Sequence, residues 1–255
     1  MKINLRQIMV VLTTILTITV NGLANALPIN GMNTGEISDS FDVYFVPAGY
    51  VFAIWGIIYI GMILFAIYQA SPKQTENPRL ARVGWWVVAG NLANAAWIFL
   101  WHYQIFGWTM VVMLALLATL LFAYEGLRQN NETASRAEFW LASVPYSIYL
   151  GWISVATIAN VSDVLYYYNW NQFGISAEIW MVIILAVVAA LAWLMSIRRQ
   201  DVAYLAVLIW AIFGITVKFP VAGIVTSATW ASFGLIVLAF LYAALMNFKK
   251  DKQHV

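Results

Sequence analysis

Residues 176–197 read SAEIWMVIILAVVAALAWLMSI, a run of 22 residues whose one charged side chain, Glu178, stands near its start. A bilayer core about 30 Å thick is crossed by about 20 apolar residues in helical conformation. A strand of a transmembrane barrel would instead show about 10 residues of alternating polarity. The stretch is too long and too uniformly apolar for a strand, so it predicts a membrane-spanning helix.

Seven further runs of the same kind lie along the chain. In order, and together with 176–197, the predicted spans are 7–27, 48–69, 83–101, 107–127, 138–161, 176–197, 202–219 and 229–248. Most connections are short, and the two longer ones, 28–47 and 162–175, are polar and rich in turn-forming residues. The expected fold class is therefore an all-α integral membrane protein, a bundle of about eight transmembrane helices.

The composition supports a membrane protein and excludes several other classes. Of the 255 residues, 63% are hydrophobic and 9% are charged, whereas soluble domains carry about 25% charged residues. There are no cysteines, which excludes a disulfide scaffold, thiol catalysis and a cysteine-ligated zinc site. A net charge of +2 gives no sign of the strongly basic surface that nucleic-acid-binding proteins carry. The expected partners are membrane lipids, and nucleic acid is not among them.

The positions of Lys and Arg predict the orientation. With the N-terminus in the cytoplasm and eight helices, the inside segments hold 12 basic residues and the outside holds only Lys218. Cytoplasmic loops of membrane proteins carry an excess of basic residues. We therefore expect both termini in the cytoplasm and residues 28–47 outside. The first span also resembles a signal peptide, because Lys2 and Arg6 precede it and Ala24-Asn25-Ala26 follows. Its cleavage would leave seven helices.

Ionisable residues are scarce within the spans, and those present lie near the ends. Glu125, Glu138, Glu178 and Lys218 can each extend to the membrane surface, and a Glu178–Lys218 pair is the alternative. Such groups are weak evidence for a proton relay or for catalysis.

The two histidines do not predict a metal site. His102 is expected in a short outside loop and His254 in the C-terminal tail. We see no catalytic constellation, no phosphate-binding loop and no metal ligand set, so the sequence predicts neither an enzyme nor a cofactor.

The aromatic residues are the informative feature, since the chain has 13 Trp, 13 Tyr and 14 Phe. Most Trp residues lie near span ends, where a belt of aromatic rings is expected. Inside the spans, polar and aromatic residues recur at three- and four-residue steps and therefore share a helix face: Asn94, Trp97 and Trp101 in one span, and Tyr149, Trp152 and Asn160 in another. Helix-to-helix hydrogen bonding explains each Asn equally well. The alternative is an aromatic cavity, with Trp97 and Trp152 as facing walls and Asn94 bonding a ligand's polar edge.

Three segments, in order, resemble the translocator protein family, the tryptophan-rich sensory proteins (TspO/MBR). They are 47–59 (PAGYVFAIWGIIY), 94–97 (NAAW) and 149–160 (YLGWISVATIAN). The first departs from the family pattern at Ala48 and Tyr50, where a second Pro and a Trp are usual, and Trp55 arrives one residue early. The resemblance covers residues 1–161. It indicates a divergent, extended member with a TspO-like five-helix part, 1–161, followed by three additional helices and a short basic tail in 162–255.

The resemblance implies a function and a site. Proteins of this family bind porphyrins and other flat hydrophobic ligands, so it implies a membrane receptor or carrier for a tetrapyrrole or sterol-like molecule in a bacterial inner or plasma membrane. Matched by position, the lining would comprise Tyr50, Trp55, Asn94, Trp97, Tyr149, Trp152 and Asn160, and spacing alone adds Trp101. The resemblance also favours retention of the first helix, and it implies a homodimer unless the added helices cover that face. A secondary transporter of a small solute is the alternative function.

Overall fold

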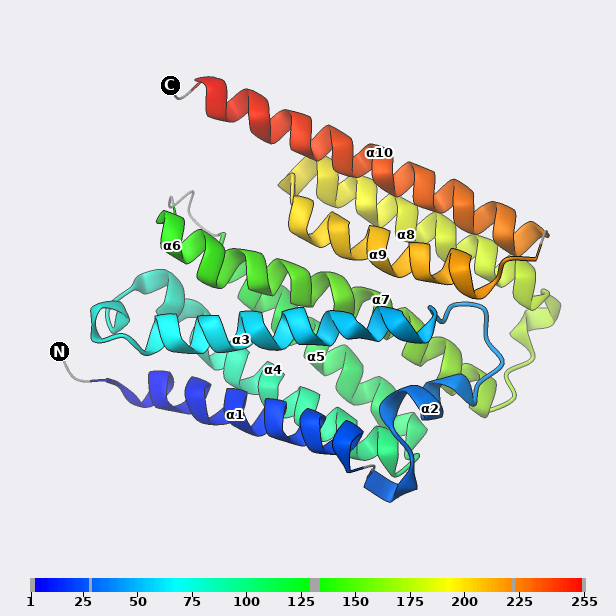
Figure 1. The fold of residues 1–255 in the computed structure, drawn as a ribbon, viewed down its shortest axis with the longest axis horizontal. Coiled ribbons are helices and arrows are strands. Elements are labelled where there is room, and N and C mark those ends of the chain that lie inside the picture. The colour runs from blue at the N-terminus through cyan, green and yellow to red at the C-terminus, as the bar shows by residue number, and fades with distance from the viewer. Residues whose placement is uncertain (1–2, 28, 129–133, 222, 254–255) are drawn as a thin grey trace. The chain divides into compact units, whose positions relative to one another are not determined.

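The computed structural model describes residues 3–27, 29–128, 134–221 and 223–253, and all regular structure in this part of the chain is helical (Figure 1). The chain forms two compact units. Unit 1 comprises Met1–Phe41 and Ala53–Val164, and unit 2 comprises Asp42–Phe52 and Leu165–Val255. The sequence-based division lay at 161/162. The structure divides the chain after Val164 and, in addition, places Asp42–Phe52 with the C-terminal helices.

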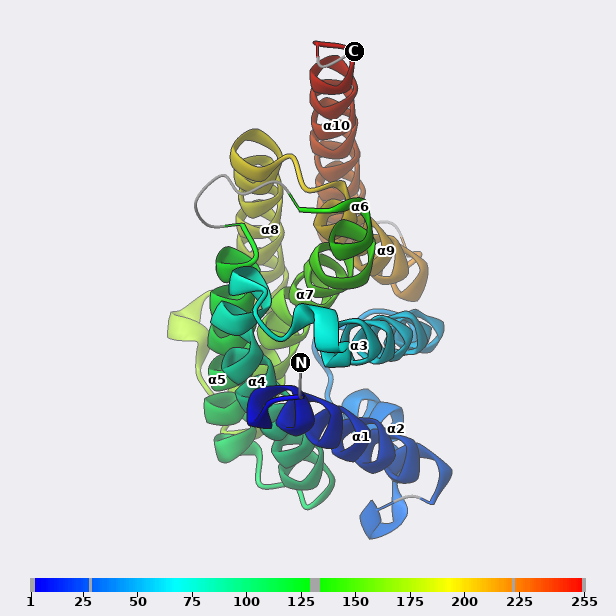
Figure 2. The ribbon, with the colours of Figure 1, turned by 90° about the vertical axis from the view of Figure 1, so that its left-hand side faces the viewer.

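Unit 1 contains five long helices and several short ones. The long helices are α1 (Leu5–Ala26), α3 (Ile54–Ala70), α4 (Pro78–His102), α5 (Phe106–Gly126) and α7 (Val144–Tyr167). The short ones are η1 (Ile29–Gly31), α2 (Thr34–Asp39), η3 (Pro72–Gln74), α6 (Arg136–Glu138) and the π-helical turn η5 (Phe139–Ser143). Helix α4 packs along both α1 and α5, and α1 also packs on α3, as the view along these helices shows (Figure 2). α4 is therefore the central helix of this unit.

Local sequence explains where these helices begin and bend. The Asn77 side chain accepts hydrogen bonds from the backbone N–H groups of Arg79 and Leu80, and Pro78 occupies the first helical position, where its missing N–H costs nothing. Pro145 cannot donate a helical hydrogen bond, and the π-turn η5 precedes it. α6, η5 and α7 thus form one continuous helical segment, Arg136–Tyr167.

Unit 2 contains η2 (Gly49–Ala53, whose last residue belongs to unit 1), η6 (Gln172–Gly174), α8 (Ala177–Arg199), α9 (Val202–Lys218) and α10 (Ile224–Gln253). α10 packs against both α8 and α9. Serine hydroxyls join the helices by donating to backbone carbonyls, Ser196 to Ala239 at 2.5 Å and Ser232 to Leu185 at 3.3 Å. The turn between α8 and α9 uses Gln200 in the left-handed conformation, and Asp201 caps α9.

The fold-class prediction is confirmed. In the described part of the chain, 7 helices are long and apolar enough to cross a membrane, and Val202–Lys218 is a shorter apolar helix. The 17 residues of this helix span about 26 Å, slightly less than an average bilayer core. The fifth predicted span, 138–161, is longer in the structure, where the helix continues to Tyr167.

Candidate functional site

A chain of hydrogen-bonded polar side chains crosses unit 1 at Asn94 of α4. The Asn21 amide on α1 donates to Asn94 Oδ1 at 2.7 Å, and Asn94 Nδ2 donates to the Tyr149 hydroxyl on α7, also at 2.7 Å. All three residues are about 2% exposed. In an apolar surrounding each polar group must find a partner within the protein, so this chain ties three helices together. It also holds the Tyr149 hydroxyl in one place.

One turn earlier on the same helix, Asn91 makes a second set of bonds to α1. Its Nδ2 donates to the hydroxyls of Thr14 at 3.0 Å and Thr13 at 3.2 Å, and its backbone carbonyl accepts from the Thr17 hydroxyl at 2.8 Å. The α1–α4 interface is thus polar over two turns. For Asn91 the structure supports the helix-to-helix role that the sequence left open.

Aromatic rings surround Tyr149. The Trp55 ring of α3 lies edge-on to the Tyr149 ring, with centroids 6.0 Å apart, and to the Trp152 ring at 6.3 Å. Trp55 also stacks on Tyr59 at 5.5 Å. Trp152 is buried and Trp55 is half-buried. Three of the residues predicted from the resemblance therefore meet in one aromatic group between α3 and α7.

Trp97 and Trp101 form a second aromatic pair, stacked on α4 with ring centroids 5.1 Å apart. Their indole N–H groups differ. Trp101 Nε1 donates to the Thr34 carbonyl at 3.2 Å. Trp97 Nε1 is buried and finds no hydrogen-bond partner among the described residues. Trp97 therefore carries an unused donor beside the Asn94 chain, three residues along the same face of α4.

Two buried polar residues, Asn160 and Asp163, lie near the end of α7, and only Asn160 was predicted from the sequence. Asn160 Nδ2 donates to the Thr109 hydroxyl of α5 at 3.0 Å, while its buried Oδ1 has no partner within the described chain. One turn on, Asp163 is 2% exposed. The sequence predicts a polar connection over 162–175, but α7 continues through Asp163 to Tyr167. Its burial within α7 is visible only in the folded structure, so the sequence carried no signal that would have identified it.

Tyr50 belongs to unit 2. It is 44% exposed, and its ring lies edge-on to Trp210 of α9 with centroids 5.4 Å apart. The same segment is bonded to α9 by its backbone, since Ala48 N–H donates to the Gly214 carbonyl at 3.1 Å and Trp210 Nε1 donates to the Val51 carbonyl at 3.0 Å. The remaining seven candidates all lie in unit 1.

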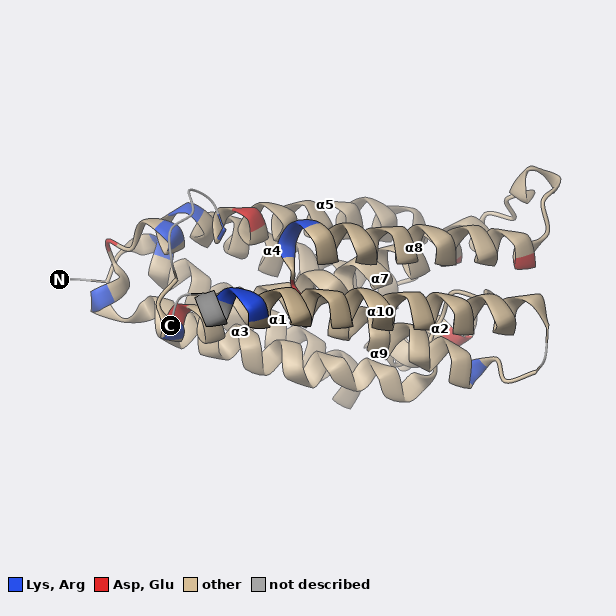
Figure 3. Ribbon diagram, turned by 90° about the horizontal axis from the view of Figure 1, so that it is seen from above, with Lys and Arg blue, Asp and Glu red and all other residues tan. Residues whose placement is uncertain are grey.

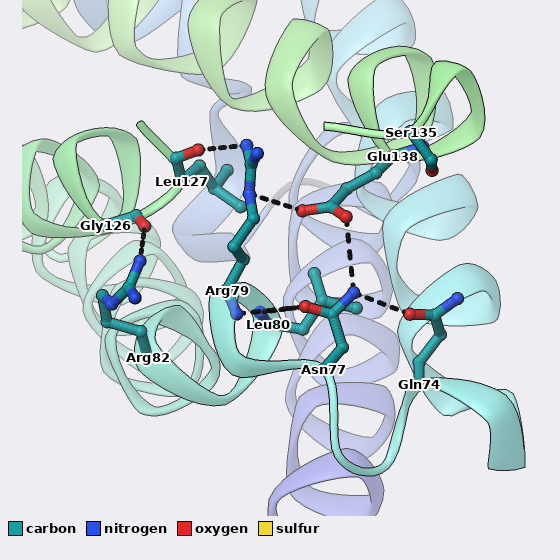
Figure 4. Close-up of polar contacts among 9 residues, drawn as sticks. All are labelled: Gln74, Asn77, Arg79, Leu80, Arg82, Gly126, Leu127, Ser135 and Glu138. Atoms are coloured by element: carbon teal, nitrogen blue, oxygen red, sulfur yellow. Dashed lines mark hydrogen bonds and ion pairs between the residues drawn. The ribbon is translucent and has the colours of Figure 1, made fainter. Parts of the chain in front are cut away.

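The other end of unit 1 carries a buried ion pair (Figure 4). Arg79 Nε lies 2.8 Å from Glu138 Oε1, and both side chains are less than a tenth exposed. Asn77 Nδ2 donates to the second Glu138 oxygen at 3.3 Å, and the Arg79 guanidinium also donates to the Leu127 carbonyl. The expectation that Glu138 extends to the membrane surface is wrong, because α6 directs it onto Arg79.

His102 also differs from its expected place in a loop. It is the last residue of α4 and is 1% exposed. Its ring lies 3.1 Å from the Ile29 carbonyl and 3.0 Å from the Thr34 hydroxyl, so it joins α4 to η1 and to the first residue of α2. His254 lies outside the described residues. Glu178, for which a Lys218 pair was considered, accepts a hydrogen bond from the Tyr44 hydroxyl at 3.1 Å.

These features together define a helical membrane protein whose polar and aromatic side chains converge inside its N-terminal unit. Within the residues that the structure describes, no three His, Cys, Asp or Glu side chains gather to hold a metal ion.

Comparison with known proteins identifies the family. The family model described as TSPO-like protein matches residues 7–244, so the chain belongs to the TSPO-like protein family. No curated protein and no solved structure matches the chain. The recognised resemblance is confirmed, and the match extends beyond 1–161 through α8, α9 and most of α10. These helices therefore belong to the family's own pattern, rather than lacking a counterpart as expected.

Proposed function

We propose that the protein is a membrane receptor or carrier that binds a flat hydrophobic molecule, such as a porphyrin or a sterol, among the aromatic side chains on either side of the Asn94–Tyr149 hydrogen bond in unit 1. The observation that carries the proposal is the Trp97 indole N–H, a buried donor without a partner among the described residues. A buried polar group that lacks a partner is costly, and a ligand acceptor would remove that cost. Membership of the TSPO-like family supports a ligand-binding role.

The arrangement of the rings suits a flat ligand. The Trp55 ring lies edge-on to the rings of Tyr149 and Trp152, with centroids 6.0 and 6.3 Å away. Aromatic walls with a few polar anchors are typical of sites for mainly apolar molecules. The Tyr149 hydroxyl accepts from Asn94 and keeps its own proton available to a ligand oxygen. Asn94 then acts mainly by positioning Tyr149, and a direct bond from Asn94 to the ligand stays a prediction.

The residue types in this group support the proposal of binding without catalysis. Trp, Tyr and Asn side chains do not titrate near neutral pH, so they are poor general acids and bases there. We therefore propose that the ligand is held or passed on unchanged.

The experiment compares two tryptophans that stack on each other. Trp97→Phe removes an N–H that bonds to no described residue, so we expect unchanged thermal stability and porphyrin affinity about five- to tenfold weaker. Trp101→Phe removes the bond to the Thr34 carbonyl, so we expect lower stability and unchanged affinity. Binding is measured from the shift of the porphyrin absorption band, which does not depend on the number of tryptophans.

Two further variants test where the ligand lies. Trp152→Ala should weaken porphyrin binding by roughly ten- to a hundredfold, by analogy with aromatic hot spots. Trp108→Ala, in the same unit but 62% exposed, is the matched control and should bind as the parent does. Equal affinity for the parent, Trp97→Phe and Trp152→Ala would exclude this site. A sterol and a carotenoid in the same panel would then identify another ligand or none.

We further propose the orientation with both termini in the cytoplasm, supported by the 12-to-1 distribution of basic residues. The absence of cysteine makes labelling clean. Ser40 is exposed, whereas the neighbouring Ser38 is buried, so Ser40→Cys is the suitable outside reporter and Lys249→Cys the inside one. An impermeant thiol reagent on intact cells should label the first and spare the second. Labelling of Lys249→Cys without labelling of Ser40→Cys would show that the orientation is opposite to the one proposed.

Transport of a small solute is the second candidate, and buried Asp163 is the observation that favours it. A carboxyl inside a membrane helix often couples to an ion or a proton. If the protein is a transporter, Asp163→Asn should abolish the uptake of the transported solute into proteoliposomes under a pH gradient. The same substitution should leave the equilibrium affinity for porphyrin unchanged. Equal solute uptake by Asp163→Asn and the parent protein would contradict a transport role for Asp163, and binding would remain as the proposed function.

A further inference from the structure

The basic residues of unit 1 gather at the end where α1 begins (Figure 3). Two of these arginines are satisfied by the protein itself. Arg79 pairs with Glu138, and Arg82 Nη1 donates to the Gly126 carbonyl at 2.9 Å (Figure 4). Arg6, in the first turn of α1, is different. It is 7% exposed, and its Nε and Nη2 atoms are buried without a hydrogen-bond partner among the described residues.

The Arg6 side chain occupies a place that α4 leaves open for it. A Cβ atom at Gly84 would lie 2.5 Å from Arg6 Cδ, 2.7 Å from Cγ and 3.3 Å from Nε. Only a glycine permits an approach this close. The aliphatic part of Arg6 is therefore packed against the α4 backbone, and no described protein group bonds to Nε or Nη2 of its guanidinium.

The two unpaired nitrogens have a specific geometry. Nε and Nη2 form the side of the guanidinium that binds two oxygens of one phosphate or carboxylate through parallel hydrogen bonds. The start of α1 adds partial positive charge, although Asn4 and Gln7 already cap two of its backbone N–H groups. Its first turn contains no acidic side chain. Two positive features thus coincide, with no anion of the described chain to balance them.

We propose that Arg6 and the first turn of α1 bind a phosphate group, supplied either by a phospholipid headgroup or by a free phosphate in solution. The ends of membrane-spanning helices lie at the level of the headgroups, where phosphate is the abundant anion. Burying an unpaired guanidinium is unfavourable, and a bound phosphate removes that penalty. This site is separate from the aromatic group of the proposed function and does not depend on it.

The test uses the full-length protein in a neutral detergent with two probes. One is phosphatidylglycerol in mixed micelles and the other is inorganic phosphate, each compared with sodium chloride at equal ionic strength. Affinity is measured from the rise of the unfolding temperature with probe concentration. Arg6→Gln should weaken phosphate binding about tenfold or more, since a bidentate charged contact is lost. Lys73→Gln removes an exposed charge from the same end and is the control.

The outcomes separate the two sources. Arg6-dependent binding of phosphatidylglycerol alone identifies a lipid headgroup, and Arg6-dependent binding of inorganic phosphate as well shows that the phosphate itself suffices. Both support the site. If Arg6→Gln loses no more affinity than Lys73→Gln with either probe, the proposal is overturned.

Should Arg6→Gln fail to fold, Arg6→Lys keeps the charge and most of the packing. A lysine ammonium cannot form two parallel bonds from one planar edge, so binding should still weaken clearly. Undiminished binding by Arg6→Lys would refute the two-oxygen geometry.

Discussion

The two units hold their helices together by different means. In unit 1, side chains bond to side chains across helices: Asn21 to Asn94, Asn94 to Tyr149, and Arg79 to Glu138. In unit 2, the interhelical bonds of Ser196 and Ser232 run from a small hydroxyl to a backbone carbonyl. A serine bonded to backbone mainly permits close packing, whereas a paired amide or charge also fixes the direction of its partner. This contrast places oriented polar groups, and with them the candidate sites, in unit 1.

Removal of Glu138 should produce the largest effect and would test the contrast most severely. Glu138→Ala leaves the Arg79 charge buried and unpaired, so we expect the free energy of unfolding to fall by about 3–5 kcal/mol. Thermal and denaturant unfolding in detergent measure this change. The double variant Arg79→Met with Glu138→Leu should recover most of the loss, because it removes both charges together. A single variant as stable as its parent would show that the pair is not buried in solution.

Close packing in unit 2 should be the next most sensitive feature. A Cβ atom at Gly214 of α9 would collide with the Val51 side chain and lie 3.2 Å from Pro47 Cβ. Gly214→Ala should therefore cost about 1–3 kcal/mol of stability through overpacking. Adding Val51→Ala frees the space, so the double variant should be more stable than Gly214→Ala alone. Strictly additive losses would mean that residues 47–51 do not pack on α9 as described.

The smallest expected effects compare single hydrogen bonds in the two units. Interhelical bonds in membrane proteins contribute about 0.6 kcal/mol on average and about 1.7 kcal/mol at most. Asn94→Ala removes two such bonds, although the Asn21 amide keeps its bond to the Thr17 carbonyl, so its stability loss should approach that upper figure. Ser196→Ala removes one bond and should lie near the average. Equal losses, measured as midpoints of unfolding in one detergent, would remove the distinction between the units.

Much of the fold could be predicted from the sequence because the bilayer sets the length of each apolar run. Five spans were correct to within about two residues, but α4 begins at Pro78 rather than at 83, and α10 runs from Ile224 to Gln253 rather than over 229–248. α7 continues past Ser162 and Asp163, which suggested a loop. The Ser162 hydroxyl instead donates to the Ile158 carbonyl one turn back, at 3.0 Å, so its polarity is satisfied within the helix. Burial of Asp163 then follows from where α7 packs, which its local sequence does not encode.

The candidate site was predictable along each helix and not between helices. The spacing of Asn94, Trp97 and Trp101 placed them on one face of α4, because helix geometry repeats every 3.6 residues. That Trp101 is bonded to the Thr34 carbonyl while Trp97 is not depends on the segment around α2, which is distant in sequence. The motif of residues 47–59 is continuous in sequence, yet the structure divides it, with Tyr50 in unit 2 and Trp55 in unit 1.

The sequence by itself determined the membrane class, the family and the apolar helices, because these depend on composition, on local periodicity and on motifs that are contiguous in the chain. Only the tertiary structure decided which polar groups are paired. Glu138 is bonded to Arg79, Asn94 to Tyr149, and Arg6 is packed against Gly84 with Nε and Nη2 of its guanidinium bonded to no described residue. The reason is physical: a hydrogen bond or an ion pair requires two groups within about 3 Å, and helix packing alone brings residues 50 or more positions apart to that distance.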